Sequence, residues 1–386
     1  MKIAIVSSFI TSTEDPRYYS SQHLNLASEL SNLGAKIDIF TMNRRNNRFY
    51  KEEVDINGSR INIYYFPPIA KMLSKLNIPM MSGIGERLKQ KDYDIIQVSE
   101  DTQLTTAQVA LQNKKSKMVI FQGINLYSRQ IVKKTLMKIF DLSIGKRVKS
   151  RTDLVIAKTS QAERFMRSKG YRNIVTIPMG VDIKHFYPRD KKESRKFLSD
   201  HGVLEREVLA LYVGNLIARR DIPTVLKAIS IVKKSGIDIG LVIVGKGGKK
   251  KSLSIMVNDL GLREVVHFLD PIPNSDMPIV YSAADVFLFA PLYETFGMVI
   301  LEAMACAIPI ISTPIPAVKD ILSENPNNGI LDFPYSSSQE LARQIMSFGL
   351  DRSLIQRKGD INLEIAKKYS WQAIARKFFE EYSKLV

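Results

Sequence analysis

The feature of this chain that most constrains its fold is a regular alternation of short apolar, β-rich runs with helix-like segments. Such alternation is typical of βαβ units, in which helices connect the strands of a parallel sheet. The sequence therefore predicts an α/β fold with parallel sheets. The runs that we expect to form strands are residues 3–6, 37–40, 95–98, 118–121, 154–157, 209–213, 241–244, 265–268, 286–289 and 308–311.

Two segments show the period of an amphipathic helix, and we expect both apolar faces to pack against a core. The first face is formed by Ile222, Val225, Leu226, Ile229 and Val232. The second, near the C-terminus, is formed by Trp371, Ile374, Phe378 and Tyr382.

The length of the chain predicts two domains. A single hydrophobic core rarely grows beyond about 250–300 residues, and this chain has 386. We place an N-terminal domain at residues 1–180, a second domain at residues 181–369 and a C-terminal helix at residues 370–386. The charged stretch at residues 189–200 reads as a polar linker and surface helix.

Glu294 and Glu302 are the most informative residues for function, because they follow the expected strand at residues 286–289. Open α/β sheets bind ligands at the carboxyl ends of their strands. Gly297 permits a sharp turn into a segment of helix formers, where free backbone amides bind anions. A carboxylate in the same crevice can accept paired hydrogen bonds from a diol. We therefore expect a ligand with phosphate and hydroxyl groups, as in a nucleotide sugar.

The runs Tyr-Glu-Thr-Phe-Gly at residues 293–297 and Leu-Glu-Ala-Met-Ala at residues 301–305 resemble the E-x7-E motif of the retaining glycosyltransferases of family 4. The resemblance covers nearly the whole chain and is most specific between residues 180 and 309. It implies the GT-B fold, which has two Rossmann-like domains and a C-terminal helix that crosses back onto the N-terminal domain.

The same resemblance implies roles for individual residues. Glu302 would bind the ribose of the donor, Glu294 a hydroxyl of its sugar, and Arg220 its diphosphate, with Glu294 and Arg220 as the catalytic pair. Further donor-binding candidates are Asn215, Gly245, Gly247, Phe296, Gly297, Met298 and Val299.

The chain departs from the family where two cations neutralise the diphosphate. The family reads Gly-Arg-Leu-x-x-x-Lys-Gly there; Arg220 matches the lysine, whereas Asn215 replaces the arginine and Asp221 the last glycine. Arg219 or Lys246 could supply the missing charge. The glycine pair that many relatives have after the first strand is also absent, because residues 7–17 form a hydroxyl-rich run instead.

The N-terminal half is strongly basic, with 29 Lys and Arg against 15 Asp and Glu in residues 1–180. Residues 129–151 hold eight basic residues and one acid beside an apolar helical face, and residues 69–81 form a second basic and apolar stretch. Basic amphipathic segments suit anionic membrane surfaces. The alternative is a connecting helix whose apolar face is ordinary core. The candidate acceptor and membrane residues are Lys133, Lys134, Lys138, Lys146 and Arg147.

Several other classes of function are disfavoured. The basic stretch lacks the interleaved aromatic residues and the sequence motifs of nucleic-acid-binding folds. The four histidines lack the spacing of metal ligands, so we expect no metal site. The single cysteine, Cys306, lies in an apolar helix-to-strand turn and is expected to be a buried structural residue.

No run reaches the roughly 18 apolar residues of a spanning helix, and the N-terminus is too strand-like for a signal peptide. We therefore expect a cytoplasmic protein.

The prediction is thus a metal-independent, retaining glycosyltransferase with no cofactor. It would move a sugar from a nucleoside diphosphate sugar to a hydroxyl of a glycan or lipid-linked acceptor at the inner face of the cell membrane. One alternative is a sugar-nucleotide epimerase of the same fold, which would need no acceptor. Another is a non-catalytic nucleotide-sugar-binding protein, which Asn215 and the absent glycine pair would favour.

Overall fold

The computed structural model describes residues 1–8, 21–43, 48–56, 58–69, 80–113, 115–128 and 130–386. Most of the hydroxyl-rich run at residues 7–17 and of the basic stretch at residues 69–81 lies outside the described residues. The described residues divide into two compact units. Unit 1 comprises the described residues between 1 and 180 together with residues 371–386, and unit 2 comprises residues 181–370.

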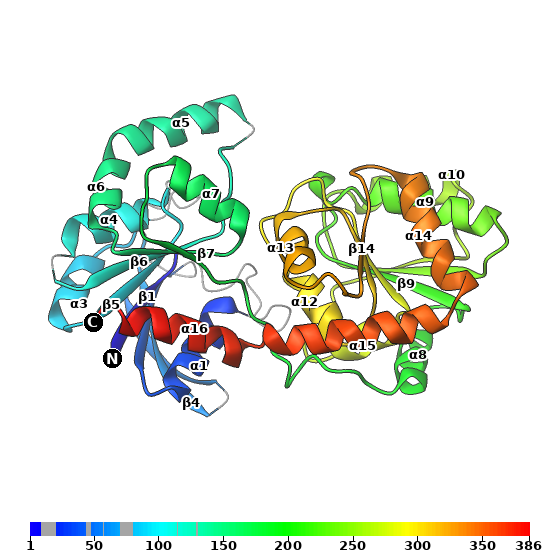
Figure 1. The fold of residues 1–386 in the computed structure, drawn as a ribbon, viewed down its shortest axis with the longest axis horizontal. Helices are drawn as coiled ribbons and strands as arrows, with labels where there is room; N and C mark the ends of the chain where they lie inside the picture. Colours follow the sequence, from blue (N-terminus) through cyan, green and yellow to red (C-terminus); the bar gives the residue numbers. More distant parts are fainter. Residues whose placement is uncertain (9–20, 44–47, 57, 70–79, 114, 129) are drawn as a thin grey trace. The chain divides into compact units, whose positions relative to one another are not determined.

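Unit 1 is built on an eight-stranded sheet with the order β3-β4-β2-β1-β5-β6-β7-β8. All neighbouring strands are parallel except β3 and β4, which form an antiparallel pair at one edge. The elements of unit 1 are β1 (Lys2–Val6), α1 (Gln22–Asn32), β2 (Lys36–Met42), β3 (Tyr50–Ile56), β4 (Ser59–Phe66), α3 (Ile84–Gln90), β5 (Ile95–Ser99), α4 (Leu104–Gln112), β6 (Lys117–Gln122), α5 (Ile131–Leu142), α6 (Ile144–Arg151), β7 (Leu154–Ala157), α7 (Ser160–Ser168), β8 (Ile174–Thr176) and α16 (Trp371–Ser383) (Figure 1).

The C-terminal helix α16 belongs to unit 1 and lies beside α1 (Figure 1). The Phe378 ring contacts the edge of Phe121 on β6, with 5.2 Å between ring centroids. The Tyr382 hydroxyl donates a hydrogen bond to Gln97 on β5. Both aromatic side chains are fully buried, so the apolar face expected at the C-terminus is part of the core of unit 1.

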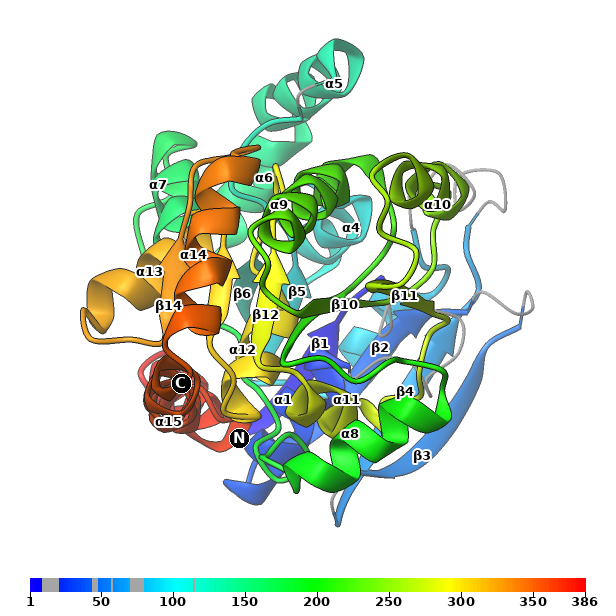
Figure 2. The same cartoon turned by 90° about the vertical axis from the view of Figure 1, so that its right-hand side faces the viewer.

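Unit 2 is built on a six-stranded parallel sheet with the order β11-β10-β9-β12-β13-β14. The chain runs outward from β9 to β10 and β11, then returns to the other side of β9 with β12. Its elements are α8 (Lys191–Asp200), β9 (Val208–Val213), the 3₁₀ helix η2 (Ala218–Arg220), α9 (Ile222–Lys234), β10 (Ile239–Val244), α10 (Lys250–Asp259), β11 (Val266–Leu269), α11 (Met277–Ala283), β12 (Val286–Phe289), α12 (Met298–Ala305), β13 (Ile310–Ser312), α13 (Pro316–Glu324), β14 (Ile330–Asp332), α14 (Ser338–Leu350) and α15 (Ser353–Lys368) (Figure 2).

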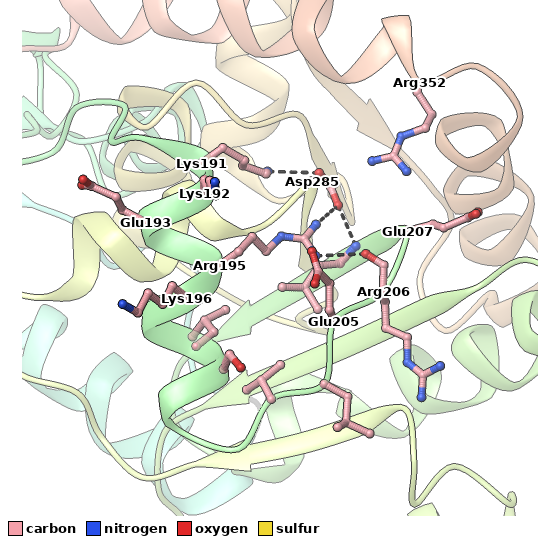
Figure 3. Close-up of a pocket in the computed structure, with 15 residues that line it drawn as sticks. Lys191, Lys192, Glu193, Arg195, Lys196, Glu205, Arg206, Glu207, Asp285 and Arg352 are labelled. Carbon is pink, nitrogen blue, oxygen red and sulfur yellow. Dashed lines mark hydrogen bonds and ion pairs between the residues drawn. The ribbon is translucent and has the colours of Figure 1, made fainter.

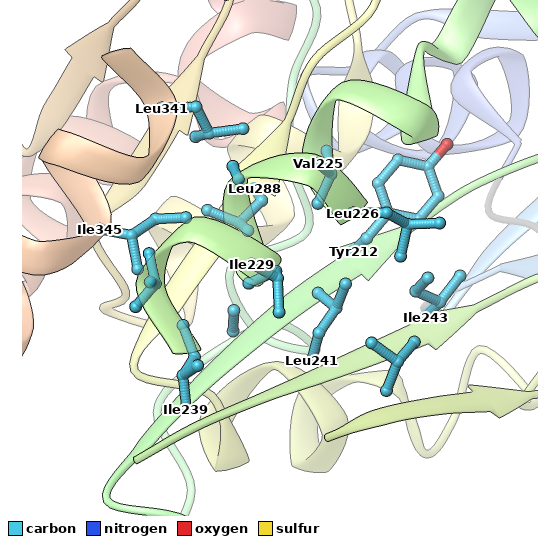
Figure 4. Packing of buried hydrophobic residues seen from close by; sticks show 14 of the residues in the cluster. Tyr212, Val225, Leu226, Ile229, Ile239, Leu241, Ile243, Leu288, Leu341 and Ile345 are labelled. Carbon is cyan, nitrogen blue, oxygen red and sulfur yellow. The ribbon is translucent and has the colours of Figure 1, made fainter. Parts of the chain in front are cut away.

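The helix expected from the period at residues 222–232 is α9, and its five apolar residues are all buried. Figure 4 shows Val225, Leu226 and Ile229 of α9 above Leu241 and Ile243 of β10. Burying apolar area contributes roughly 25 cal/mol per Å². This packing anchors the loop that precedes α9 and carries Arg219 and Arg220.

The predicted α/β architecture with parallel sheets is confirmed, and each of the ten expected runs overlaps a strand. One edge of the sheet of unit 1 differs from the expected parallel arrangement, because β3 is antiparallel to β4. That strand begins with Tyr50-Lys-Glu-Glu and is largely exposed, so it lacks the apolar signal of an inner strand. β4, β8 and β14 were also not expected; the last two are three residues long.

Phe378→Ala should lower the free energy of unfolding by about 3–5 kcal/mol, because it removes a fully buried ring that holds α16 to the sheet. Phe379→Ala is the matched control, since the neighbouring ring is partly exposed. Urea unfolding followed by circular dichroism measures both. Equal losses in the two variants would contradict this packing.

Candidate active site

The candidate site lies at the carboxyl ends of β9 and β12, where the strand order of unit 2 reverses direction. Crevices at such switch points are the usual ligand sites of open α/β sheets. Arg219 and Arg220 come from η2 after β9, and Glu294 comes from the loop after β12. The backbone joins the same two loops, because the amide of Leu292 donates to the carbonyl of Arg219 at 2.9 Å.

One carboxylate is shared by two guanidinium groups. Glu294 Oε2 lies 3.1 Å from Nη1 of Arg219 and also forms an ion pair with Nη1 of Arg220. Arg219 donates a second hydrogen bond, to the carbonyl of Tyr293. The amide of Thr295 donates to the other carboxylate oxygen at 2.9 Å. Two positive charges against one negative charge leave a net positive charge, which attracts an anion.

Arg220 is held beneath the surface of this site. Its side chain is 13% exposed, and its guanidinium lies over the Phe289 ring, 5.1 Å from the centroid. Nε and Nη1 have no hydrogen-bond partner in the described part of the chain, although Nη1 is within ion-pair distance of Glu294. A buried guanidinium with unused donors is suited to binding a phosphate.

The helix α12 begins beside Glu294. Gly297 has φ = 86°, in the left-handed region, and a Cβ at this position would lie 3.1 Å from the Phe289 ring. Only glycine adopts this turn without strain. The first-turn amides of α12, including those of Met298 and Val299, have no acceptor within the helix. Free amides at a helix start are suited to binding an anion. The preceding Phe296 is buried.

Glu302 has different surroundings from Glu294. It is the fifth residue of α12, and its carboxylate accepts a hydrogen bond from the Tyr281 hydroxyl of α11 at 2.8 Å. Burial raises the pKa of Glu302 to about 7, and the Tyr281 hydrogen bond acts in the opposite direction. Near neutral pH this carboxyl group is therefore poised between its two forms, and a ligand that donates hydrogen bonds favours the ionised form.

The loops after β9 and β10 are joined by backbone hydrogen bonds, from Gly214 to Val244 and from Leu216 to Lys246. A Cβ on Gly245 would lie 2.1 Å from the Gly214 carbonyl oxygen, and one on Gly247 2.3 Å from that of Leu216. These two glycines thus have a structural role, which is to let the loops approach each other. Asn215 is exposed at the surface of the same loop.

Asp221 has a left-handed backbone, the conformation that suits the glycine of the family pattern at this position. Its φ of 45° and ψ of 42° are left-handed, a conformation that Asp tolerates better than most residues. Its carboxylate accepts hydrogen bonds from Thr224 and Ser336, both at 2.8 Å. The substitution therefore preserves the turn between η2 and α9.

The structure brings Arg220, Glu294 and the start of α12 together, with Arg219 beside them. Lys246, the other residue considered for the missing charge, is exposed in the loop after β10. Sequence reasoning missed Tyr281 as the partner of Glu302, because nothing in its local pattern marks a helix residue that contacts a distant acid. Cys306 is buried, as expected for a structural residue.

The five basic candidates for the acceptor or membrane lie on α5 and α6, and all of them are exposed. None of the twelve residues of α5 is buried, within the part of the chain that the structure describes. The alternative that its apolar face is ordinary core is therefore wrong for Val132, Leu136 and Ile139, whereas Phe140 is partly buried and packs against the core of unit 1. The exposed apolar side chains of α5 are Ile131 (82% exposed), Val132 (72%), Leu136 (60%), Ile139 (56%) and Leu142 (70%).

These five side chains, which we call the apolar arc of α5, span about 140° at 100° per residue. The opposite side of α5 is tied to unit 1 through Asp141. Its carboxylate accepts a hydrogen bond from Tyr127 at 2.7 Å and pairs with Lys169 at 2.7 Å. This anchor directs the apolar arc away from the unit, and Figure 2 shows α5 projecting from unit 1.

No group of three or more His, Cys, Asp or Glu side chains among the described residues could hold a metal ion. None of the helices that these residues form is long and apolar enough to cross a membrane.

A cavity of about 860 Å³ lies at the amino end of the sheet of unit 2, at the edge opposite the candidate site (Figure 3). Asp285, immediately before β12, pairs there with Lys191 at 3.0 Å and Arg195 at 2.5 Å and accepts from the Leu209 amide. Because both cations come from α8, we interpret this cluster as the attachment of α8 to the sheet.

The fold and the site define a two-unit α/β protein that gathers two arginines and a glutamate at the switch point of its second sheet. Comparisons with known proteins place it in a family. Residues 193–361 match the model for "Glycosyl transferases group 1", and residues 22–185 match the model for "Glycosyltransferase Family 4". The chain therefore belongs to the group 1, family 4 glycosyltransferases.

Individual relatives are distant. A D-inositol 3-phosphate glycosyltransferase from Corynebacterium jeikeium is 28% identical over 244 residues, which are 60% of this chain and 58% of that protein. The matched regions span about half of the length of the first curated relatives, 48–58%.

Solved structures match over the full chain. Sucrose-phosphate synthase from Thermosynechococcus elongatus is 21% identical with a TM-score of 0.79, and covers 100% of this chain and 98% of its own. Anabaena HepE in complex with UDP-glucose is 18% identical with a TM-score of 0.73, and covers 100% of both chains. These likenesses confirm the GT-B fold.

Gly247→Ala should lower the free energy of unfolding by about 1–3 kcal/mol, because its methyl group would overlap the Leu216 carbonyl and separate the two loops. Gly248→Ala is the matched control, since a Cβ there meets nothing within 4 Å. Urea unfolding compares them. If the two variants are equally stable, the loops do not need the close approach.

Proposed function

We propose that this protein transfers a sugar from a nucleoside diphosphate sugar to an acceptor hydroxyl. The observation that carries the proposal is the pair Arg219 and Arg220 sharing Glu294 at the start of α12. Arginines and helix-start amides are groups that bind a diphosphate. The family of the chain and the UDP-glucose bound to Anabaena HepE support the same donor class.

In this proposal each part of the donor meets a different part of the site. The diphosphate binds Arg220, Arg219 and the first-turn amides of α12, while the ribose donates hydrogen bonds to Glu302. Glu294 binds a hydroxyl of the transferred sugar and holds the two guanidiniums in place. Arg219 takes the role of the family arginine that Asn215 replaces, because it reaches the same carboxylate as Arg220.

The chemistry follows from the charge that develops when the sugar leaves the diphosphate. Fixed guanidiniums and amides stabilise the growing negative charge on the leaving phosphate. We propose that no metal ion is needed, so that activity persists in EDTA, and that the anomeric configuration is retained, which NMR of the product tests. A product of inverted configuration would contradict the retaining mechanism. Loss of activity in EDTA would contradict metal independence.

The acceptor side of the proposal is a glycan or lipid-linked molecule at an anionic membrane surface, on the cytoplasmic side of the cell membrane. Its support is α5, whose apolar arc is exposed and is accompanied by Lys133, Lys134 and Lys138. An amphipathic helix of this kind lies in a bilayer interface with its apolar face buried. Each nearby Lys or Arg adds about 1 kcal/mol on an anionic surface.

Arg220→Met should lower kcat/KM by about 100- to 1000-fold, the usual effect of removing one group that stabilises developing charge. Arg219→Met should produce a smaller loss, because that side chain is 41% exposed and better screened. Lys246→Met is the matched control and should remain near wild type. Steady-state kinetics with the nucleotide sugar measure all three, and a larger loss in Lys246→Met would reassign the second cation.

Donor affinity should rise about tenfold between pH 6 and pH 8. The pKa of Glu302 is about 7 without ligand, and hydroxyl donors from the ribose favour the ionised form, so binding releases a proton. The neighbouring Tyr281 and Cys306 do not titrate in this window, because burial raises both pKa values further. Titration calorimetry across this range checks the slope, and Glu302→Gln should abolish it. A flat wild-type profile would remove Glu302 from the donor site.

The double variant Leu136→Asp and Ile139→Asp should lose most of its binding to vesicles of phosphatidylcholine and phosphatidylglycerol, because it places charge in the apolar arc. Leu111→Asp on α4 is the matched control, since Leu111 is also an exposed leucine of unit 1 (56%). Cosedimentation at low and high salt measures binding. The membrane proposal is wrong if the wild-type protein does not pellet with these vesicles at low salt.

Incubation with the donor alone separates the competing functions. Epimerisation of UDP-N-acetylglucosamine without an acceptor would establish the epimerase and contradict the transferase. If Glu294→Ala leaves the biological activity intact, the protein acts by binding rather than by catalysis.

A further inference from the structure

A second polar site lies in unit 1, at the carboxyl ends of β5, β6 and β7. The strand order reverses direction in this unit too, because β1 lies between β2 and β5. Glu100 follows β5, Gly123 follows β6 and Lys158 follows β7. None of these residues belongs to the donor site, which lies entirely in unit 2.

Glu100 is fixed by the backbone of the next loop. Its carboxylate accepts hydrogen bonds from the amide of Gly123 at 3.0 Å and from that of Ile124 at 2.9 Å. Its own φ is 60°, which is strained for a residue other than glycine; such strain persists where the surroundings hold it, often at functional sites. These amides hold the Glu100 carboxylate in place beside Lys158.

Lys158 is a buried cation with poor partners. Its side chain is 12% exposed, and Nζ lies 3.9 Å from Glu100 Oε1, which is beyond hydrogen-bond distance. Nζ donates one long hydrogen bond, 3.4 Å, to Gln22 Oε1 of α1 and lies 4.5 Å from the centre of the Phe121 ring. Burial lowers the pKa of Lys158, and Glu100 acts in the opposite direction. An ammonium group has three donors, and a buried charge is costly unless it is paired.

His23 adds a second buried donor close to Lys158. Burial, and then Lys158, lower the pKa of His23 to about 3, so its imidazole is neutral at physiological pH. Its Nε2 lies 3.3 Å from the side-chain nitrogen of Gln22. Because Gln22 Oε1 accepts from Lys158, that nitrogen is the donor, and the proton of His23 is assigned to Nδ1. Nδ1 is buried and has no hydrogen-bond partner among the described residues.

A glycine is required in the same place. A Cβ on Gly123 would lie 3.0 Å from Cδ and 3.2 Å from Nζ of Lys158. The missing side chain therefore lets Lys158 pack directly against the backbone of this loop. Four features therefore occur together at the carboxyl edge of the sheet of unit 1, the edge at which open α/β sheets bind ligands. They are a buried cation with weak partners, a buried donor nearby, a strained backbone and a glycine that contacts the cation.

We propose that Lys158 binds an acidic group, a phosphate, of the acceptor. As an acceptor site this rests on the transferase function proposed above, whereas the binding of phosphate does not. The phosphate could belong to a soluble sugar phosphate or to a lipid headgroup, since both present the same oxygens to the ammonium group. Lys158 is a binding and positioning residue here and takes no part in the transfer of the proton or the sugar.

Titration calorimetry with glycerol 1-phosphate, and with glycerol as the uncharged match, tests the proposal in the absence of donor. The wild type should bind the phosphate and not glycerol. Lys158→Met should weaken binding at least tenfold, whereas Lys158→Arg should stay within a few-fold. Lys115→Met, which changes an exposed lysine of unit 1, should bind like the wild type.

Two results would overturn the proposal: no phosphate binding by the wild type at millimolar concentration, or unchanged binding by Lys158→Met. If circular dichroism shows that Lys158→Met is unfolded, Lys158→Gln replaces it, and equal binding by Lys158→Gln and wild type overturns the proposal in the same way.

Vesicles of phosphatidylcholine with phosphatidic acid distinguish the two sources of phosphate. For a lipid headgroup, both Lys158→Met and the double variant of the apolar arc should weaken vesicle binding. For a soluble acceptor, only the apolar-arc variant should weaken vesicle binding. Lys158→Met should then weaken the binding of glycerol 1-phosphate and leave vesicle binding unchanged. Neither the calorimetry nor the vesicle experiment uses a sugar donor. Phosphate binding through Lys158 can therefore be found even if the protein proves to have no transferase activity.

Discussion

The ion pairs of Glu294 with Arg219 and Arg220 are the interaction on which the rest of the candidate site depends. They join the loop after β9 to the loop after β12 across the switch point of the sheet. A single carboxylate between two guanidiniums keeps both cations oriented while leaving a net positive charge. In a partly buried site this charge is less screened than at the surface. An anionic ligand therefore gains from a site that is already assembled.

The two glutamates that mark the motif lie in different surroundings. Glu294 is held by arginines, whereas Glu302 is held by a tyrosine hydroxyl in apolar surroundings that raise its pKa. The first arrangement favours a carboxylate that orients cations. The second favours a group whose charge responds to a hydroxyl-bearing ligand. We interpret the pair as a donor clamp rather than as an acid and base acting on one bond.

Much of the fold could be predicted from the sequence, because the inner strands are continuous apolar runs. β3 could not, since Lys51, Glu52 and Glu53 on an exposed edge carry no apolar signal. In the site, Glu294 and Gly297 could be predicted because they follow an expected strand. Which of Arg219 and Lys246 lies beside Glu294 could be seen only in the tertiary structure. Lys158 was not identified at all, because a lysine after a strand looks like a surface residue until its burial is known.

Thermal unfolding with UDP, GDP and ADP sugars is the most direct test that unit 2 binds a nucleotide sugar through this site. At one hundred times its dissociation constant, a ligand adds about 2.7 kcal/mol to the free energy of unfolding. The account predicts that at least one of the three bases raises the unfolding temperature of the wild type, and that Arg220→Met loses most of this shift. If none of the nucleotide sugars stabilises the wild-type protein, or if Arg220→Met responds as the wild type does, the donor site is not where we place it.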